Sequence, residues 1–221
     1  MKKGDIMLTL EKMKEFVNSY ATRLKEMQPL LNELDNRIGD GDHGTNMARG
    51  FQTAVDKLVS SPQTDLETLC NTVAMALLSS VGGASGPLYA TVFMRLSVAW
   101  KGQTVVDLAT LQVALTMALE GLQSRGKASV GDKTMIDVWM PVVNTLRQDI
   151  SVNGLRRCVK TASECAKASK DLVAKKGRAA YLGERSIGTP DPGAVSSTIF
   201  FEELVAVCLG EVERTQWEVL I

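Results

Sequence analysis

Three aspartates, Asp35, Asp40 and Asp42, lie within eight residues of one another in the segment DNRIGDGD. Gly39 and Gly41 separate them and let the backbone fold back on itself, so the three carboxylates can share one small volume. Like charges that close repel one another, and a hard divalent cation removes this cost. Magnesium prefers oxygen ligands and keeps positions open for water and phosphate. The segment therefore predicts a site for two Mg²⁺ ions that bridge the phosphates of a nucleotide.

Two other interpretations compete with this magnesium site. A calcium-binding helix-loop-helix site fails on spacing, because the loop lacks the later acidic residues and the closing glutamate. An acidic turn in which Asp42 caps the next helix stays open from the spacing alone. His43, the only histidine, stands at the expected start of that helix, where backbone N–H groups favour an anion. We interpret it as a phosphate contact, with a surface histidine that assists the cap as the alternative.

Small residues in the segment VGGASGPLY, residues 81–89, precede another expected helix. Pro87 suits the first turn of a helix, which leaves backbone N–H groups and the Ser85 hydroxyl free for a phosphate. The segment is not a P-loop, because no GxxxxGK[ST] sequence occurs and no strand precedes it. It is a candidate phosphate cradle, and close helix packing through its glycines is the alternative.

The segment SRGKASVGDKTM, residues 124–135, combines a helix start with candidate binding residues. Thr134 is expected to cap the following helix while Asp137 reaches back in a capping-box arrangement. Met135 is placed either against an adenine face or in the core, which is the default for a methionine at helical spacing. For Lys127 and Lys133 a solvated position is an equal alternative to ligand binding.

The longest expected loop, residues 178–196, is too long for a simple helix connection, and long ordered loops are often functional. Arg178 and Arg185 offer the planar fork that suits phosphate. Asp191 could accept from a ribose hydroxyl or cap the last helix. A solvated flap is the alternative interpretation.

Helices must position these loops. Apolar residues that recur at alternating steps of three and four positions predict eight such helices. Pro29 falls inside the first and is expected to kink or restart it. No run alternates as a strand does, so the chain is predicted to be all-α and one domain, residues 1–221. Alternate connections in an antiparallel array fall at the same end, where the four loops are expected to converge. The eight segments are 10–34, 46–58, 66–78, 88–100, 108–122, 136–146, 155–173 and 195–209.

The composition narrows the class of protein. The 221 residues carry 25 basic and 25 acidic side chains, so no positive field favours nucleic acid or an anionic membrane. We find no signal peptide and no stretch of about 18 apolar residues. The four cysteines form no CxxC pair and are read as buried thiols in a reducing compartment. We therefore expect a soluble, cytoplasmic protein.

Four motifs in this order, D-x4-D-x-D-H-G, GGASGP, GDKTM and GRAAYLGERSIG-x2-DPGA, resemble the nucleotide-binding L subunit of dihydroxyacetone kinases over essentially the whole chain. The resemblance implies a barrel of eight antiparallel amphipathic helices with ADP or ATP at one end. It implies that Asp35, Asp40 and Asp42 hold two Mg²⁺ ions on the phosphates. The further nucleotide contacts that it implies are His43, Gly44, Thr45, Asn46, Ala84, Ser85, Gly126, Met135, Arg178, Asp191 and Gly193.

The resemblance also implies partners, because the chain has no second domain for a ketose. A separate K subunit would bind dihydroxyacetone, and an M subunit would rephosphorylate the bound ADP from phosphoenolpyruvate. The alternatives are a subunit that exchanges ATP, in a kinase for another ketose such as erythrulose, and a nucleotide-dependent module that binds a transcription factor. Whether the helical barrel also encloses a lipid or another apolar ligand stays open from the sequence.

Overall fold

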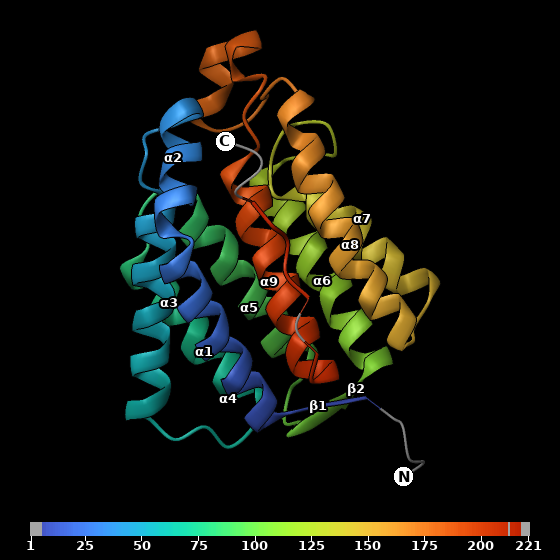
Figure 1. Cartoon of the computed structure of the whole chain (residues 1–221). Coiled ribbons are helices and arrows are strands. Elements are labelled where there is room, and N and C mark those ends of the chain that lie inside the picture. The colour runs from blue at the N-terminus through green and yellow to red at the C-terminus, as the bar shows by residue number, and fades with distance from the viewer. Residues whose placement is uncertain (1–5, 212, 218–221) are drawn as a thin grey trace.

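The computed structural model describes residues 6–211 and 213–217, and it confirms the all-α prediction (Figure 1). The described residues form nine α-helices, two short 3-10 helices and one pair of three-residue strands. The helices are α1 Leu10–Glu26, α2 Gln28–Ile38, α3 His43–Ser60, α4 Leu66–Ser80, α5 Ser85–Ala99, α6 Leu108–Gly126, α7 Ile136–Gln148, α8 Val152–Ala168 and α9 Pro192–Leu209. The remaining elements are β1 Met7–Thr9, β2 Val105–Asp107, η1 Ser169–Asp171 and η2 Arg178–Ser186.

Eight of the helices close a barrel. Successive helices α3 to α8 pack side by side, and α9 lies between α8 and α1, which itself packs on α3 (Figure 1). The ninth helix, α2, arises because the first expected helix ends at Glu26 and restarts at Gln28 with Pro29 in its first turn. The predicted restart at the proline is therefore confirmed, and α2 extends the barrel at one end.

Aromatic rings fill the middle of the barrel. Phe200 of α9 packs on Phe16, Tyr20 and Trp139 with ring centroids 4.9, 5.5 and 5.1 Å away. The contacts with Phe16 and Tyr20 are edge-on and that with Trp139 is tilted, and such aromatic pairs contribute beyond the burial of apolar area. Helix α9 is long and apolar enough to cross a membrane by length and composition, but 83% of that window is buried inside the protein. It is the core helix of the barrel.

The strands β1 and β2 pair antiparallel, with Leu8 opposite Val106, at the end of the barrel away from α2 and η2 (Figure 1). The sequence did not predict them, because three residues are too few for a visible alternation. They tie the start of α1 to the start of α6 and leave the opposite end for the long loops.

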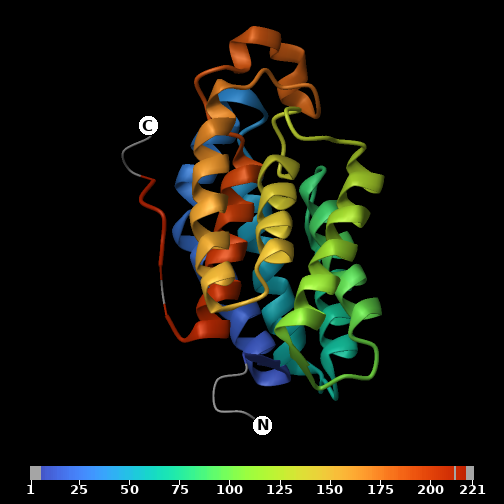
Figure 2. The ribbon, with the colours of Figure 1, turned by 90° about the vertical axis from the view of Figure 1, so that its right-hand side faces the viewer.

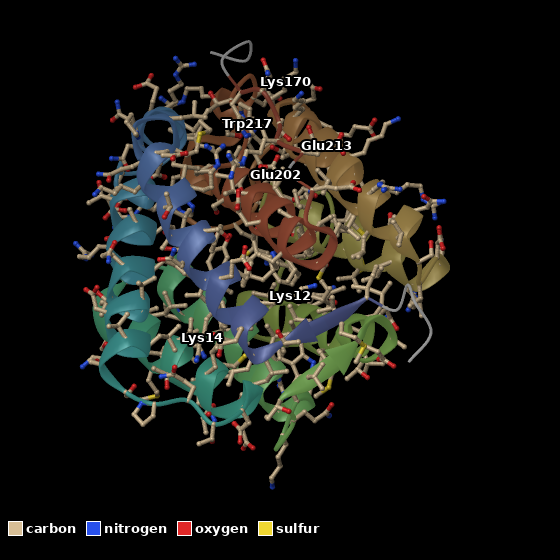
Figure 3. All side chains as sticks on the ribbon, turned by 60° about the horizontal axis from the view of Figure 1, so that its bottom comes forward. Lys12, Lys14, Lys170, Glu202, Glu213 and Trp217 are labelled. Carbon is tan, nitrogen blue, oxygen red and sulfur yellow. The ribbon has the colours of Figure 1, made fainter. Side chains whose placement is uncertain are left out.

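The segment after α9 folds back along this helix and covers its outer face (Figure 3). Arg214 pairs with Glu203 at 3.1 Å, and the backbone N–H of Thr215 donates to Glu202 Oε1 at 2.7 Å. Glu202 and Glu203 are buried, as is Trp217. Burial raises the pKa of Glu202. The segment thus shields two carboxylates that α9 would otherwise present on the outside of the barrel.

All four cysteines are free thiols. Cys70, Cys158 and Cys208 are buried as expected, and Cys165 is only partly buried. Burial raises the pKa of Cys158 to about 12 and that of Cys208 to about 11. A thiol with so high a pKa is a poor nucleophile, so these cysteines serve as small apolar side chains.

Candidate nucleotide and metal site

The four glycine-containing loops converge at the end of the barrel beside α2 and η2, as the sequence predicted (Figure 2). They enclose a pocket of about 330 Å³. Eleven of the fourteen residues expected at the site line it: Asp35, Asp40, Asp42, His43, Ala84, Ser85, Gly126, Met135, Arg178, Asp191 and Gly193.

The three aspartates form one cluster, because each offers an oxygen and these oxygens all lie within 4.8 Å of one another. Asp35 is buried, while Asp40 and Asp42 are exposed. Burial raises the pKa of Asp35, hydrogen bonds from the backbone of His43 and Asp42 lower it, and the charges of Asp40 and Asp42 raise it again. Hard oxygen donors in this arrangement suit Mg²⁺.

Asp35 also builds the start of α3. Its Oδ2 accepts hydrogen bonds from the backbone N–H groups of Asp42 at 2.9 Å and His43 at 3.1 Å. Asp42 occupies the N-cap position, but its own side chain makes no cap hydrogen bond. The alternative in which Asp42 caps the helix is therefore wrong. A Cβ at Gly39 would fall on Asp35 Oδ1, so this glycine leaves room for the carboxylate.

Arg178 stands over the acidic cluster. It begins η2, and its Nη2 lies 3.1 Å from Asp40 Oδ2. The arginine side chain is 70% exposed, so this ion pair contributes little to stability and can be exchanged for another anion. A guanidinium beside a predicted metal cluster is well placed to meet a phosphate. Arg185, the other arginine considered from the sequence, is exposed and is not among the residues that line the pocket.

His43 opens a chain of buried polar groups that runs from the pocket into the barrel. Its Nε2 lies 3.0 Å from Ser196 Oγ, which lies 2.9 Å from the hydroxyl of Tyr89. The Tyr89 hydroxyl is also 3.3 Å from Ser197 Oγ, which accepts from Trp139 Nε1 at 3.1 Å. Burial lowers the pKa of His43 to about 4, against the opposing charge of Asp42. The histidine is therefore neutral at neutral pH and faces the pocket as a hydrogen-bonding group.

Part of the pocket wall is apolar. Met135, Leu122, Leu88 and Ala128 line it, which suits a planar base. Met135 is buried, as the core interpretation predicts, and it also lines the pocket, so packing against an adenine face stays a prediction.

Asp191 lies at the start of α9 beside this pocket. Its carboxylate accepts from the backbone N–H of Ala194 at 2.8 Å, so it caps the helix as one of the sequence alternatives predicted. Burial raises the pKa of Asp191 to about 7, although the hydrogen bond from Ala194 lowers it. A carboxyl with this pKa changes protonation with small changes in the charges around it.

The capping arrangement predicted before α7 is present only in part, because Met135 rather than Thr134 occupies the N-cap position and makes no side-chain cap hydrogen bond. One lysine beside it, Lys133, does not lie where a solvated residue would lie. Asp137 Oδ2 accepts from the backbone N–H of Thr134 at 2.7 Å, and Thr134 Oγ1 accepts from that of Ile136 at 3.2 Å. Lys127 is exposed, whereas Lys133 is buried at 1% exposure.

The sequence of residues 37–206 matches the family model of the DAK2 domain. The chain belongs to the DAK2 domain family. The ADP-binding subunit DhaL of PEP-dependent dihydroxyacetone kinase 1 from Listeria innocua is 44% identical over 190 residues, 86% of this chain and 92% of the relative. The ADP-binding subunit DhaL of the PEP-dependent dihydroxyacetone kinase of Escherichia coli is 44% identical over 186 residues, 82% of this chain and 88% of the relative.

A solved structure carries the same DAK2-like fold. The native dihydroxyacetone kinase of C. freundii superposes with a TM-score of 0.68 at 26% identity, over 87% of this chain and 33% of that longer chain. The crystal structure of that kinase in complex with AMP-PNP and Mg²⁺ superposes with a TM-score of 0.65 at 24% identity, over the same shares, which shows the fold alone.

Three residues expected to contact the nucleotide do not line the pocket of this DAK2 domain. Gly44 packs against α2, where a Cβ would fall on the backbone of Gln28. Thr45 Oγ1 accepts from Asn32 Nδ2 at 2.9 Å and from Gln28 Nε2 at 3.1 Å, so it fastens α2 to α3. Asn46 is buried and accepts from Arg49. Gly44 and Thr45 thus pack α3 against α2, while the bond of Asn46 lies within α3. The contact of these three residues with a nucleotide stays a prediction.

Sequence reasoning also missed residues that touch the site. Ser196 on α9 is hydrogen-bonded to His43, and Tyr89 on α5, which lines the pocket, is hydrogen-bonded to Ser196 in turn. Lys176 and Gly177 line the pocket next to Arg178. No local pattern announces them, because their neighbours come from other helices.

Proposed function

We propose that this chain is the ADP-binding subunit of a phosphoenolpyruvate-dependent dihydroxyacetone kinase, a phosphotransferase. The observation that supports this most strongly is the single pocket in which three carboxylates, an exposed arginine and an apolar wall meet. This is the combination that a magnesium-bound nucleotide needs. The alignments with relatives named as ADP-binding DhaL subunits cover most of this chain and most of the length of each relative.

Asp35, Asp40 and Asp42 would hold two Mg²⁺ ions, which neutralise phosphate charge when bound. The protein supplies the remaining contacts. His43 would donate or accept a hydrogen bond at a phosphate, and Ala84 and Ser85 at the start of α5 would present backbone N–H groups to another.

The base and the sugar would occupy the other side of the pocket. Met135 would pack on the adenine face, and Gly126 and Gly193, which line the pocket, would lie beside the nucleotide. Asp191 would accept from a ribose hydroxyl, because one of its oxygens caps α9 and the other stays available. Arg178 would exchange Asp40 for the phosphoryl group in transfer and stabilise its charge.

The acceptor must come from another chain, because the described loops form one pocket whose groups suit the nucleotide. We propose a K-type subunit that binds dihydroxyacetone and an M-type subunit that returns a phosphoryl group from phosphoenolpyruvate to the bound ADP. A core helix buried within the barrel and a chain of zero net charge support a cytoplasmic protein that binds neither membrane nor nucleic acid.

The test begins with the nucleotide. Protein purified in magnesium should release ADP on denaturation, detected by mass spectrometry, in a ratio near one per chain. Mixed with a K-type and an M-type partner and phosphoenolpyruvate, it should form dihydroxyacetone phosphate, and Asp40→Ala should abolish this while circular dichroism keeps its helical signal. The absence of nucleotide even with added magnesium and ADP would falsify the proposal.

A further inference from the structure

Lys133 is a buried cation that the proposed chemistry does not use. Its side chain is 1% exposed, and its backbone adopts a φ of +60°, in the left-handed region that non-glycine residues seldom occupy. A long cationic side chain is rarely buried to this extent unless its charge is satisfied. Favourable interactions of the ammonium must therefore offset the free-energy cost of its burial and of the strained backbone.

The partners are three backbone carbonyl groups. Lys133 Nζ donates to the carbonyl oxygens of Ser169 at 3.0 Å, Leu172 at 3.0 Å and Ser186 at 2.7 Å. An ammonium has three N–H donors, and all three are used. The ammonium thus fastens both ends of residues 172–186, which we call the lid.

The lid carries the groups that face the phosphates. It contains η2, Arg178 with its ion pair to Asp40, and Lys176, which lines the pocket. In Figure 2 it forms the cap above the end of the barrel. A shift of the lid would therefore move Arg178 away from the acidic cluster.

Little apolar burial holds the lid in place. Among residues 172–186 only Ala174 and Ser186 are buried. Apart from Lys133, the lid is held to the barrel by the backbone N–H of Lys175, which donates to the carbonyl of Asp132 at 3.0 Å, and by ion pairs of Lys175 with Asp132 at 3.8 Å and of Arg178 with Asp40 at 3.1 Å. The 3-10 helix η2 also packs against α2, and the N–H of Ala174 donates to Ser186 Oγ at 2.9 Å within the lid itself. Segments with few buried contacts open at low free energy. The three hydrogen bonds of the buried Lys133 ammonium are therefore a large part of the interactions that keep the lid closed.

Resting on the proposed nucleotide site, we propose that Lys133 is a positioning residue whose ammonium holds the lid over the bound nucleotide, keeps Arg178 at the phosphates and slows nucleotide release. Lys133 also lines the pocket, but its three ammonium donors are taken by the carbonyl groups of Ser169, Leu172 and Ser186. Lys133 acts on the nucleotide indirectly, because it fixes the carbonyl groups at the two ends of the lid and so fixes the position of the lid.

The experiment compares Lys133→Met with Lys127→Met in the full chain. Methionine has a similar length and no donor, and both lysines lie in the same loop with positive φ, but Lys127 is exposed. Two readouts are measured: the release rate of a fluorescent ADP with Mg²⁺ by stopped flow, and limited trypsin cleavage of the nucleotide-free lid at Lys175, Lys176, Arg178 and Arg185. Lys133→Met is expected to raise both rates at least tenfold, with Lys127→Met equal to wild type.

A second variant tests whether the ammonium itself acts. In Lys133→Ala, added methylammonium or ammonium should slow trypsin cleavage of the lid again by binding among the three free carbonyls, and sodium should not. Cleavage and release rates equal to wild type in Lys133→Met would overturn the inference, as would loss of the helical circular dichroism signal, which would assign Lys133 to the core. Failure of wild type to bind the fluorescent ADP would instead count against the proposed nucleotide site, because the trypsin readout needs no nucleotide.

Discussion

Neutralising Asp35 should have two opposite effects: it should stabilise the metal-free protein by removing charge repulsion, and it should weaken the binding of Mg²⁺ and ADP. Asp35→Asn keeps an oxygen that can accept from the backbone N–H groups of Asp42 and His43, and it removes one negative charge. Oxygens of the three aspartates lie within 4.8 Å, and unit charges at that distance repel by roughly 1 kcal/mol in water and roughly 3.5 kcal/mol at an effective dielectric of about 20. Because Asp40 and Asp42 are exposed and screened, we expect metal-free Asp35→Asn to be more stable than wild type by about 1–3 kcal/mol at neutral pH.

This gain should depend on pH in a definite direction. The pKa of Asp35 is raised above its ordinary value of 3.8, chiefly by burial, so the folded chain binds more protons than the unfolded chain just above that pH. Wild-type stability therefore falls as the pH rises through this window, and below 3.8 the carboxyl is protonated in both states. The advantage of Asp35→Asn should be absent at about pH 3 and complete at about pH 8.

Urea unfolding followed by circular dichroism measures this, in EDTA and again with Mg²⁺ and ADP. Wild type should gain about 2.7 kcal/mol when free ligand is about 100 times its Kd, and the variant should gain almost nothing. Asp56→Asn, an exposed aspartate on α3, is the matched control and should stay within about 0.5 kcal/mol of wild type. The reasoning is refuted if Asp35→Asn is the less stable protein in EDTA at pH 8, or if it keeps the full stabilisation by Mg²⁺ and ADP.

Three further predictions concern neighbouring residues. Gly39→Ala should weaken Mg²⁺-ADP binding at least tenfold by calorimetry, because its Cβ displaces the Asp35 carboxylate; unchanged affinity would contradict the packing. Asp191→Asn should stabilise the metal-free chain by about 2–4 kcal/mol at pH 8 and by little at pH 4. The folded pKa of Asp191 is about 7, so wild type loses stability as the pH rises from 3.8 to about 7. If urea unfolding gives the same stability difference between variant and wild type at both pH values, this prediction is wrong. Ser196→Ala should lower stability by about 1–3 kcal/mol and reduce phosphoryl transfer, because His43 loses its partner, and Ser196→Thr should recover part of both in thermal unfolding and coupled assays; no recovery would argue against the hydrogen bond.

The sequence predicted the parts of this structure that depend on local pattern. The apolar positions Met13, Val17, Tyr20 and Leu24 recur with the helical period and are all buried on α1. Pro29 announced the break before α2 because it lacks a backbone donor. The loops carry their own glycines, so their positions along the chain, and with antiparallel packing their convergence, could be read in advance.

Contacts between distant segments could not be read in this way. His43 meets Ser196 across 153 positions of sequence, and nothing near either residue indicates the other. Lys133 was assigned only as solvated or ligand-binding, because its burial depends on carbonyl groups that 3-10 helices present more than thirty positions away. The close packing of Gly44 against Gln28 of α2 could likewise not be predicted from the motif that contains it.

The chain of hydrogen bonds that begins at His43 ends on an indole. Trp139 donates to Ser197 within the barrel, while the buried indole N–H groups of Trp100 and Trp217 have no hydrogen-bond partner among the residues that the structure describes. Trp100 is the C-cap of α5 at the far end of the barrel, and Trp217 lies in the C-terminal segment. Neither tryptophan is therefore part of the hydrogen-bond network that begins at His43. The emission spectrum of Trp139 is therefore a built-in optical probe of the pocket, and a variant that retains only this tryptophan lets nucleotide and metal be titrated without any attached dye.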